Sequence, residues 1–232
     1  MNQCMKNWRG EADCQSCEQR ASVLFAGVEE RHLAQIRHSI DDISVEAGDA
    51  LYRGGDAGEC IFTIRSGLLK LVQYLPDGNR RIVRLIRGND VVGLEALLGQ
   101  PYQHDAIVLQ RAAACRIPIG VLRQLDKDNP GLTQELMRRW QRALTEADAW
   151  LTELSTGSAR QRIARLLLRL VDEEGNGVCE LFGREDIGAM LGITTETASR
   201  IIAEFRRNGL IVETEPDHFR CSPNDLEKIA GD

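Results

Sequence analysis

Apolar and polar residues follow different periods in successive parts of the chain, and each period predicts a different element. The first 22 residues are polar and rich in cysteine, which indicates an N-terminal arm. Residues 28–40 carry apolar side chains at helical spacing. From residue 43 to residue 119, glycines separate short apolar runs, so CIFTIRSG, LLKLVQYL, RRIVRLI and CRIPI predict strands of an antiparallel β-roll. The pairs Ser66-Gly67 and Asp77-Gly78 are expected to be turns.

A long helical pattern begins at Pro130 and ends at Gly157-Ser158. Its apolar residues form an uncharged a/d seam over about three heptads. A helix packed on its own domain is one interpretation. A dimer helix fits better, because the seam is narrow and the rest of the helix is strongly polar, and we expect a homodimer even without a cofactor. The seam consists of Met137, Trp140, Leu144, Ala147, Leu151 and Leu154.

Two shorter helical patterns with a glycine between them follow. REDIGAMLGI predicts a helix that ends at Gly192, and TETASRIIAEFRRNG predicts a second helix with a capping residue within Thr194-Thr195-Glu196. LIVET and HFRCS then predict a small hairpin. This order is the layout of a winged helix-turn-helix.

The outer face of the second helix carries residue types that suit DNA. Arg200 can pair with guanine, Glu196 can accept from cytosine N4, and Ser199 can meet a phosphate or a thymine edge. Thr195 shares this face, and Arg206 and Arg207 are placed for contacts to the DNA backbone. Residues 159–232 hold ten basic and fourteen acidic residues, so a helical hairpin with a solvated charged face is the alternative. The face and the upstream dimer helix favour a palindromic double-stranded site.

Composition narrows the class of protein. The 232 residues are 43% hydrophobic, with a net charge of −6, and they contain no apolar run of membrane-spanning length and no signal-peptide core. We therefore expect a cytoplasmic protein that does not bind membranes. The sequence shows no nucleophile–base pattern, no phosphate-binding glycine loop and no clustered carboxylates, which argues against an enzyme.

These patterns predict an α+β chain with four parts. Residues 1–22 form a cysteine-containing arm, 23–128 a β-roll sensor domain, 129–156 the dimerisation helix, and 157–232 the winged helix-turn-helix domain.

With these features, the sequence resembles the Crp–Fnr family of bacterial transcription regulators. The resemblance covers nearly the whole chain, from AGDALYRGGDAGECIFTIRSGLLKL and GNDVVGLEALLG through the long helix to TTETASR. The last segment matches the Glu-x-x-Ser-Arg pattern of the Fnr-like branch, whereas the cyclic-AMP branch has arginine at position 195 and glycine at position 199. The resemblance implies a jelly-roll sensor domain, a homodimer, an inverted repeat of TTGAT-type half-sites, and RNA polymerase as a partner.

The resemblance also raises the question of a cyclic nucleotide. In the cyclic-AMP branch an Arg-Ser pair follows a Gly-Glu turn and holds the phosphate. Here Glu95 is present, but Gln103-His104-Asp105-Ala106 occupies the later segment. Without an arginine there, and with an aspartate that would repel phosphate, we do not expect cyclic AMP to bind.

The cysteines are the candidate sensor. In Fnr-like oxygen sensors three arm cysteines and one roll cysteine hold a [4Fe–4S] cluster, and Cys14, Cys17 and Cys115 match three of these positions. The third arm cysteine is missing from EQRASVLF, so Cys4 would have to complete the set. Two alternatives remain open: a thiol switch formed by Cys14 and Cys17, or no cluster at all, with nitric oxide sensed through a haem or a small molecule bound in the roll.

The remaining three cysteines have a simpler interpretation. They fall in or beside predicted strands and are expected to be buried thiols. They are Cys60, Cys179 and Cys221.

Overall fold

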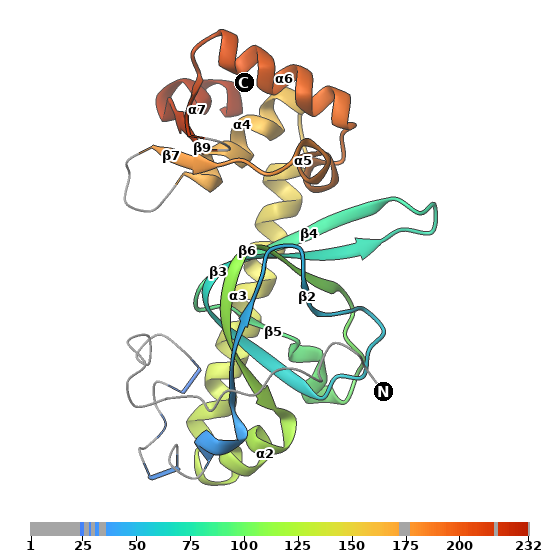
Figure 1. Cartoon of the computed structure of the whole chain (residues 1–232), viewed down its shortest axis with the longest axis vertical. Coiled ribbons are helices and arrows are strands. Elements are labelled where there is room, and N and C mark those ends of the chain that lie inside the picture. The colour runs from blue at the N-terminus through green and yellow to red at the C-terminus, as the bar shows by residue number, and fades with distance from the viewer. Residues whose placement is uncertain are drawn as a thin grey trace. The chain divides into compact units, whose positions relative to one another are not determined.

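The computed structural model describes residues 24–25, 28, 31–32, 36–171, 177–215 and 218–231. These residues belong to two compact units, one comprising residues up to 75 together with 83–145, and the other 76–82 together with 146–232. Antiparallel sheet and helices occur side by side (Figure 1), which confirms the predicted α+β class. No described helix is long and apolar enough to cross a membrane.

A six-stranded sheet forms the β-roll. The strands are β1 (Asp41–Val45), β2 (Ala50–Tyr52), β3 (Cys60–Tyr74), β4 (Arg80–Ile86), β5 (Val91–Val92) and β6 (Asp105–Pro118). The main strand order is β1-β6-β3-β4, and in addition β2 pairs with β6 and β5 pairs with β3. The pairs of β6 with β1, β2 and β3, and the pair of β3 with β5, are antiparallel. The short helices beside them are η2 (Arg37–Ser39), η3 (Leu94–Leu98) and α2 (Ile119–Asp128).

Gly67 corrects one sequence prediction. It lies inside β3 rather than in a turn, so CIFTIRSG and LLKLVQYL belong to one continuous strand. Its φ is +90°, and a β-carbon there would lie 2.4 Å from the carbonyl oxygen of Arg111 on β6. The register between β3 and β6 shifts at this point. The glycine therefore makes a bulge with close backbone approach. By contrast, Asp77-Gly78 does form a turn, where the Asp77 carboxylate accepts from the Asn79 N–H at 3.0 Å.

The roll is followed by α3 (Pro130–Leu154), a single helix of 25 residues. Proline suits the first position of a helix, because it lacks the N–H that would have no partner there. Gly157 follows the helix with a φ of +82°, in the left-handed region that glycine adopts readily.

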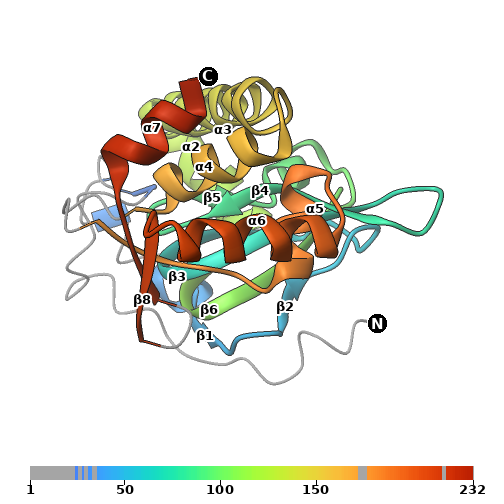
Figure 2. The ribbon, with the colours of Figure 1, turned by 90° about the horizontal axis from the view of Figure 1, so that it is seen from above.

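The described residues of the second unit form a three-stranded sheet and four helices besides the end of α3. The elements are α4 (Ala159–Leu170), β7 (Val178–Glu180), α5 (Arg184–Leu191), α6 (Thr195–Arg207), β8 (Ile211–Glu215), β9 (His218–Cys221) and α7 (Pro223–Gly231). The sheet has the order β7-β9-β8, with both pairs antiparallel, and α7 packs against α4. Figure 2 shows α6 running from α5 towards β8.

Arg165 joins three segments of this unit. Its Nε and Nη2 donate to the carbonyl oxygen of Ala230 in α7, at 2.9 and 2.7 Å. Its Nη1 donates to the carbonyl oxygens of Glu153 and Thr156, each at 3.0 Å. These carbonyls lie at or near helix ends, where helical partners are missing. The guanidinium thus ties the end of α3 and the C-terminal helix to α4.

Candidate DNA-binding interface

Helices α5 and α6 pack closely through apolar side chains. Gly192 ends α5 with a φ of 63°. At Gly188 a β-carbon would lie 2.7 Å from the carbonyl oxygen of Ile193, so glycine lets the turn close. The two helices and their glycine turn have the predicted helix-turn-helix layout. The buried residues include Ile187, Met190 and Leu191 on α5 and Ala198, Ile201, Ile202 and Phe205 on α6.

Thr194 caps α6. Its hydroxyl oxygen accepts a hydrogen bond from the Thr197 N–H at 3.2 Å, which satisfies a donor without a partner in the first turn. Glu196 lies in that turn. Hydrogen bonds from its own backbone N–H and from the Thr194 side chain hold the pKa of the Glu196 carboxyl below its usual range. At neutral pH this side chain is therefore a carboxylate that can only accept hydrogen bonds.

The N-terminal half of α6 exposes four polar side chains, those of Thr195, Glu196, Ser199 and Arg200. Their spacing along the helix brings them to one face. To the described residues the Arg200 guanidinium makes no hydrogen bond or ion pair, so its donors are available for a ligand. A polar, exposed helix tip with an available arginine is suited to reading base edges in a major groove.

The two arginines that end α6 differ in their surroundings. Arg206 forms an ion pair with Glu213 of β8 at 2.8 Å, and its guanidinium lies 5.9 Å from the centre of the Phe219 ring. Arg207 is exposed and forms no ion pair with the part of the chain that the structure describes. Arg206 is therefore already engaged by the wing, whereas Arg207 can reach a phosphate without losing a partner.

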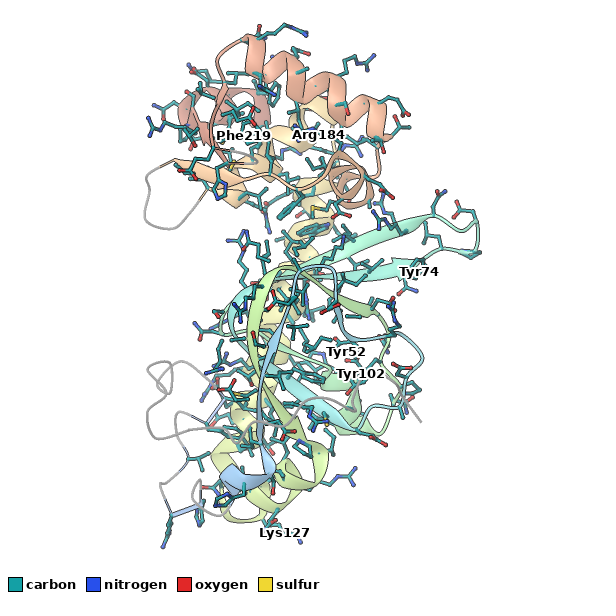
Figure 3. All side chains as sticks on the ribbon, in the orientation of Figure 1. Tyr52, Tyr74, Tyr102, Lys127, Arg184 and Phe219 are labelled. Atoms are coloured by element: carbon teal, nitrogen blue, oxygen red, sulfur yellow. The ribbon has the colours of Figure 1, made fainter. Side chains whose placement is uncertain are left out.

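Arg220, on the wing, is a further candidate for DNA contact that was not predicted from the sequence. In β9, Phe219 and Cys221 point inward and are 2% and 5% exposed, while Arg220 between them is exposed. Alternation within HFRCS is the signal that could have revealed it, since residues of a strand point to opposite faces in turn. Phe219, against which Arg206 lies, is labelled in Figure 3.

Helix α3 exposes a row of large apolar side chains. Met137, Trp140, Leu144 and Leu151 are 67%, 44%, 54% and 63% exposed, and Ala147 between them is partly exposed. Leu154 differs from the prediction: it is 0% exposed, buried within its own chain, and cannot belong to this row. The helix ends here inside the second unit, so the last seam position packs against its own domain.

Of the four predicted cluster ligands, only Cys115 lies among the described residues. Cys4, Cys14 and Cys17 lie outside the described residues, and the described ranges contain no group of three or more potential metal-ligating side chains. Cys115 is half-buried in β6, opposite Asp42 on β1 and Thr63 on β3. The Thr63 hydroxyl is buried and has no hydrogen-bond partner among the described atoms.

Glu95, in η3, is tied to the segment that follows this helix. The Glu95 carboxylate accepts from the Gln103 N–H at 3.0 Å. The Asp105 carboxylate accepts from the Gly54 N–H at 2.8 Å and pairs with Arg53 at 3.1 Å. Acidic side chains, each with its own donor, thus occupy the region in which a phosphate would need cations.

Two tyrosines pack beside Gly93 at the start of η3, and both are labelled in Figure 3. The rings of Tyr52 and Tyr102 stack with centroids 4.1 Å apart, and the Tyr102 hydroxyl donates to the Cys60 carbonyl oxygen at 2.7 Å. Burial raises the pKa of Tyr102 to about 12, so its hydroxyl stays protonated and able to donate. Burial also lowers the pKa of the nearby His104. A neutral imidazole there cannot supply the cation that a phosphate would need.

Comparison with known proteins identifies the family. The Cyclic nucleotide-binding domain family matches residues 42–129, and the Crp-like helix-turn-helix domain family matches residues 161–229. Electron transport regulator A of Shewanella oneidensis is 30% identical over 183 residues, which cover 74% of this chain and 73% of that protein. The chain belongs to the Crp/Fnr family.

Similarity to two other regulators supports this assignment. The fumarate and nitrate reduction regulatory protein of Escherichia coli is 27% identical over 226 residues, covering 94% of this chain and 90% of that protein. A crystal structure of a CRP-family transcriptional regulator from Thermus thermophilus matches with a TM-score of 0.72 and 25% identity, covering 82% of this chain and 97% of that one. This Crp/Fnr protein is accordingly a transcription regulator with a DNA-binding helix-turn-helix.

Proposed function

We propose that this Crp/Fnr protein is a homodimeric regulator that reads an inverted repeat of TTGAT-type half-sites through the outer face of α6. The exposed and available Arg200 beside the ionised Glu196 is the observation that carries the proposal. Arg200 pairs with guanine, Glu196 accepts from cytosine N4, and Ser199 and Thr195 complete the contact surface. Arg207, with Arg206 and Arg220 on the wing side, contacts phosphates.

The second element of the proposal is the dimer. Four large apolar side chains on one helix remain well exposed in the single chain, and a second copy would cover them as in a coiled coil. The dimer face comprises Met137, Trp140, Leu144, Ala147 and Leu151, without Leu154. Residues 129–156 would then serve dimerisation, between a sensor domain at 23–128, preceded by the 1–22 arm, and a DNA-binding domain at 157–232. RNA polymerase is the further partner proposed for the DNA-bound dimer.

The third element is the signal, for which we propose oxygen, redox state or nitrogen oxides. Relatives of this chain are named as an electron transport regulator and as fumarate and nitrate reduction regulatory proteins. Cys4, Cys14, Cys17 and Cys115 would hold a [4Fe–4S] cluster, and such a cluster supplies chemistry that is sensitive to oxygen and nitric oxide. Cys115 fits this role, because its half-buried thiol lies on β6, an interior strand of the sheet. Opposite it on β3 is Thr63, whose buried hydroxyl has no hydrogen-bond partner among the described atoms.

A sensor without a cluster is the second candidate. The acidic, already hydrogen-bonded segment from Gln103 to Asp105 disfavours cyclic AMP. The alternatives are another small molecule in the roll, nitric oxide bound through a haem, or thiol oxidation of Cys14 and Cys17. Anaerobic purification followed by an absorption spectrum and iron and sulfide analysis separates the two candidates. Visible absorption that is lost in air and in Cys115→Ser supports the cluster, and a colourless, iron-free protein refutes it.

The DNA-reading proposal is tested by changing the protein and the site together. Arg200→Ala should cost about 1–3 kcal/mol per half-site on the TTGAT palindrome and much less on a palindrome whose guanines are replaced. Arg123→Ala is the matched control, because this exposed arginine on α2 carries the same charge far along the chain from α6. Fluorescence anisotropy measures the binding of wild type, Arg200→Ala and Arg123→Ala to both DNA sites. An equal loss on both DNA sites would refute base reading by Arg200.

A further inference from the structure

The winged domain contains a pair of cysteines that the sequence keeps far apart. Cys179 in β7 and Cys221 at the end of β9 are separated by 42 positions, yet their sulfur atoms lie 3.1 Å apart. Both side chains are buried, with 2% and 5% of their surface exposed. None of the described cysteines forms a disulfide in this structure. A contact this short means that the two side chains already point at one another.

The sheet fixes this geometry. Cys179 is opposite Phe219 in the β7–β9 register, and the Cys221 N–H donates to the Gly177 carbonyl oxygen at 2.7 Å. Cys221 is therefore diagonal to Cys179 on the same face of the sheet, since residues two apart on a strand share a face. Backbone hydrogen bonds on both strands hold the thiols together, so joining them needs only the small movement that brings the sulfur atoms to bonding distance.

The two thiols are also chemically unequal. The hydrogen bond between the two thiols lowers the pKa of Cys221, and burial opposes this shift. The same hydrogen bond, together with burial, raises the pKa of Cys179. We assign Cys221 as the thiol that becomes the thiolate, the nucleophilic form, and the variants described below test this assignment.

We propose that Cys179 and Cys221 form a reversible disulfide within the DNA-binding domain when the protein meets hydrogen peroxide. The Cys221 thiolate attacks one peroxide oxygen, the O–O bond breaks, and with one proton the leaving oxygen becomes water, which leaves a sulfenic acid on Cys221. The Cys179 sulfur then attacks the Cys221 sulfur, the S–O bond breaks, and the Cys179 proton leaves with the hydroxyl as a second water. In total, two thiols are oxidised to a disulfide and one peroxide is reduced to two waters.

The position of this bond in the chain gives it a consequence for the reading unit. The two cysteines flank α5, α6 and β8, so the disulfide closes a ring that contains the complete helix-turn-helix. A cross-link of this kind restricts the unfolded chain and stabilises the folded domain. The oxidised domain should therefore unfold at a temperature at least about 5 °C higher than the reduced one.

Peptide mapping of the full chain after treatment with hydrogen peroxide and blocking of free thiols tests the proposal directly. Trypsin cleaves after Arg169, Arg184, Arg220 and Lys228, so the expected product is peptide 170–184 linked to peptide 221–228. The link should disappear on adding a dithiol. Neither DNA nor iron enters this measurement, so its outcome is independent of the proposed DNA site and cluster. A native wild-type chain in which the linked pair is absent, or in which Cys221 reaches only the sulfinic acid, overturns the proposal.

Variants assign the two roles. In Cys179→Ala the peroxide product should stop at a sulfenic acid on Cys221, which a cyclic 1,3-diketone traps, whereas Cys221→Ala should leave Cys179 unlabelled. Cys60→Ala is the matched control, because Cys60 is equally buried but lies in the roll, and it should leave the yield of linked peptide unchanged. Circular dichroism shows whether each variant folds. Labelling of Cys179 in the Cys221→Ala variant would overturn the assignment of the nucleophile.

Discussion

Helices α3 and α6 both expose a row of side chains, but the two rows are of opposite kinds. On α3 the row consists of large apolar residues within an otherwise polar surface, and Met137 and Leu151 leave more than 60% of their surface in water. On α6 the exposed residues are polar, while Ile202 and Phe205 on its other side are buried almost completely. An apolar face gains free energy by excluding water, so it needs a protein partner. A polar face with available donors is hydrated favourably in water, so it needs no protein partner, and it can bind a polar ligand.

The helices also differ in how far local contacts stabilise them. Helix α6 has a hydrogen-bonded N-cap at Thr194 and packs against α5 and α4 within its own unit. Helix α3 spans the division between the two units and keeps its apolar row uncovered in the single chain. Helix α6 is therefore expected to be stable in a monomer, whereas α3 gains much of its stability from a second copy.

The largest expected effect comes from placing a charge in the apolar row. Leu144→Glu should weaken dimerisation by about 3 kcal/mol or more, because two like charges would face each other in the interface. Sedimentation equilibrium measures the change in the dissociation constant of the dimer. Thr145→Glu adds the same charge at the neighbouring exposed position and should leave the dimer intact. If both variants remain dimeric, the apolar row is not the dimer face.

Substitutions of the two arginines at the end of α6 test which of them contacts DNA phosphates. Arg207→Ala should weaken binding to every DNA sequence alike and reduce the slope of log K against log salt by about 1 per chain. Arg206→Ala should have a smaller effect on the slope, because Glu213 already neutralises Arg206 at 2.8 Å. Anisotropy titrations over a range of salt concentrations measure both slopes. A larger change for Arg206 would show that DNA displaces Glu213.

Removing the cap tests whether α6 is stabilised locally. Thr194→Ala should lower the free energy of unfolding of the DNA-binding domain by about 1 kcal/mol, because the Thr197 N–H loses its partner. Urea unfolding followed by circular dichroism gives the difference. Thr195→Ala, one residue further on and without a capping bond, should change stability by less than half as much. Equal losses would mean that the hydrogen bond is not the cause.

The smallest effect concerns the pKa of Glu196. Because its folded pKa is lowered, its contribution to stability is fully present above the unfolded value of about 4.3 and is lost as the pH falls through the folded value. The stability difference between wild type and Glu196→Gln should therefore stay constant from about pH 8 to pH 5 and shrink only below about pH 4. Urea unfolding at several pH values checks this. A difference that falls between pH 7 and pH 5 would contradict the lowered pKa.

Sequence patterns predicted most of the fold because the relevant contacts are local. The period of 3.6 places Ile187 and Ile202 on buried faces, and Gly192 marks the turn between their helices. Gly67 was predicted wrongly, because a glycine in a bulge and a glycine in a turn look alike until the partner strand is known.

The candidate sites were predictable to different degrees for the same reason. The face of α6 follows from helical spacing alone, and all four of its proposed base contacts are exposed. Leu154 continues the heptad of α3 but is buried by its own domain, which spacing along one helix cannot reveal. The meeting of Cys179 with Cys221 depends on the β7–β9 register, which joins residues on either side of the helix-turn-helix.

The bonds of Arg165 determine where the DNA-binding half can be cut from the chain. Its guanidinium holds the carbonyls of Glu153 and Thr156 on one side and that of Ala230 on the other. A fragment that starts at Ser158 retains every helix of the reading unit but removes two of these acceptors, and a deletion of α7 removes the third. An excised or transplanted module must therefore begin within the last turns of α3 and keep the chain through Ala230. The portable unit of this regulator is thus longer at both ends than its helix-turn-helix.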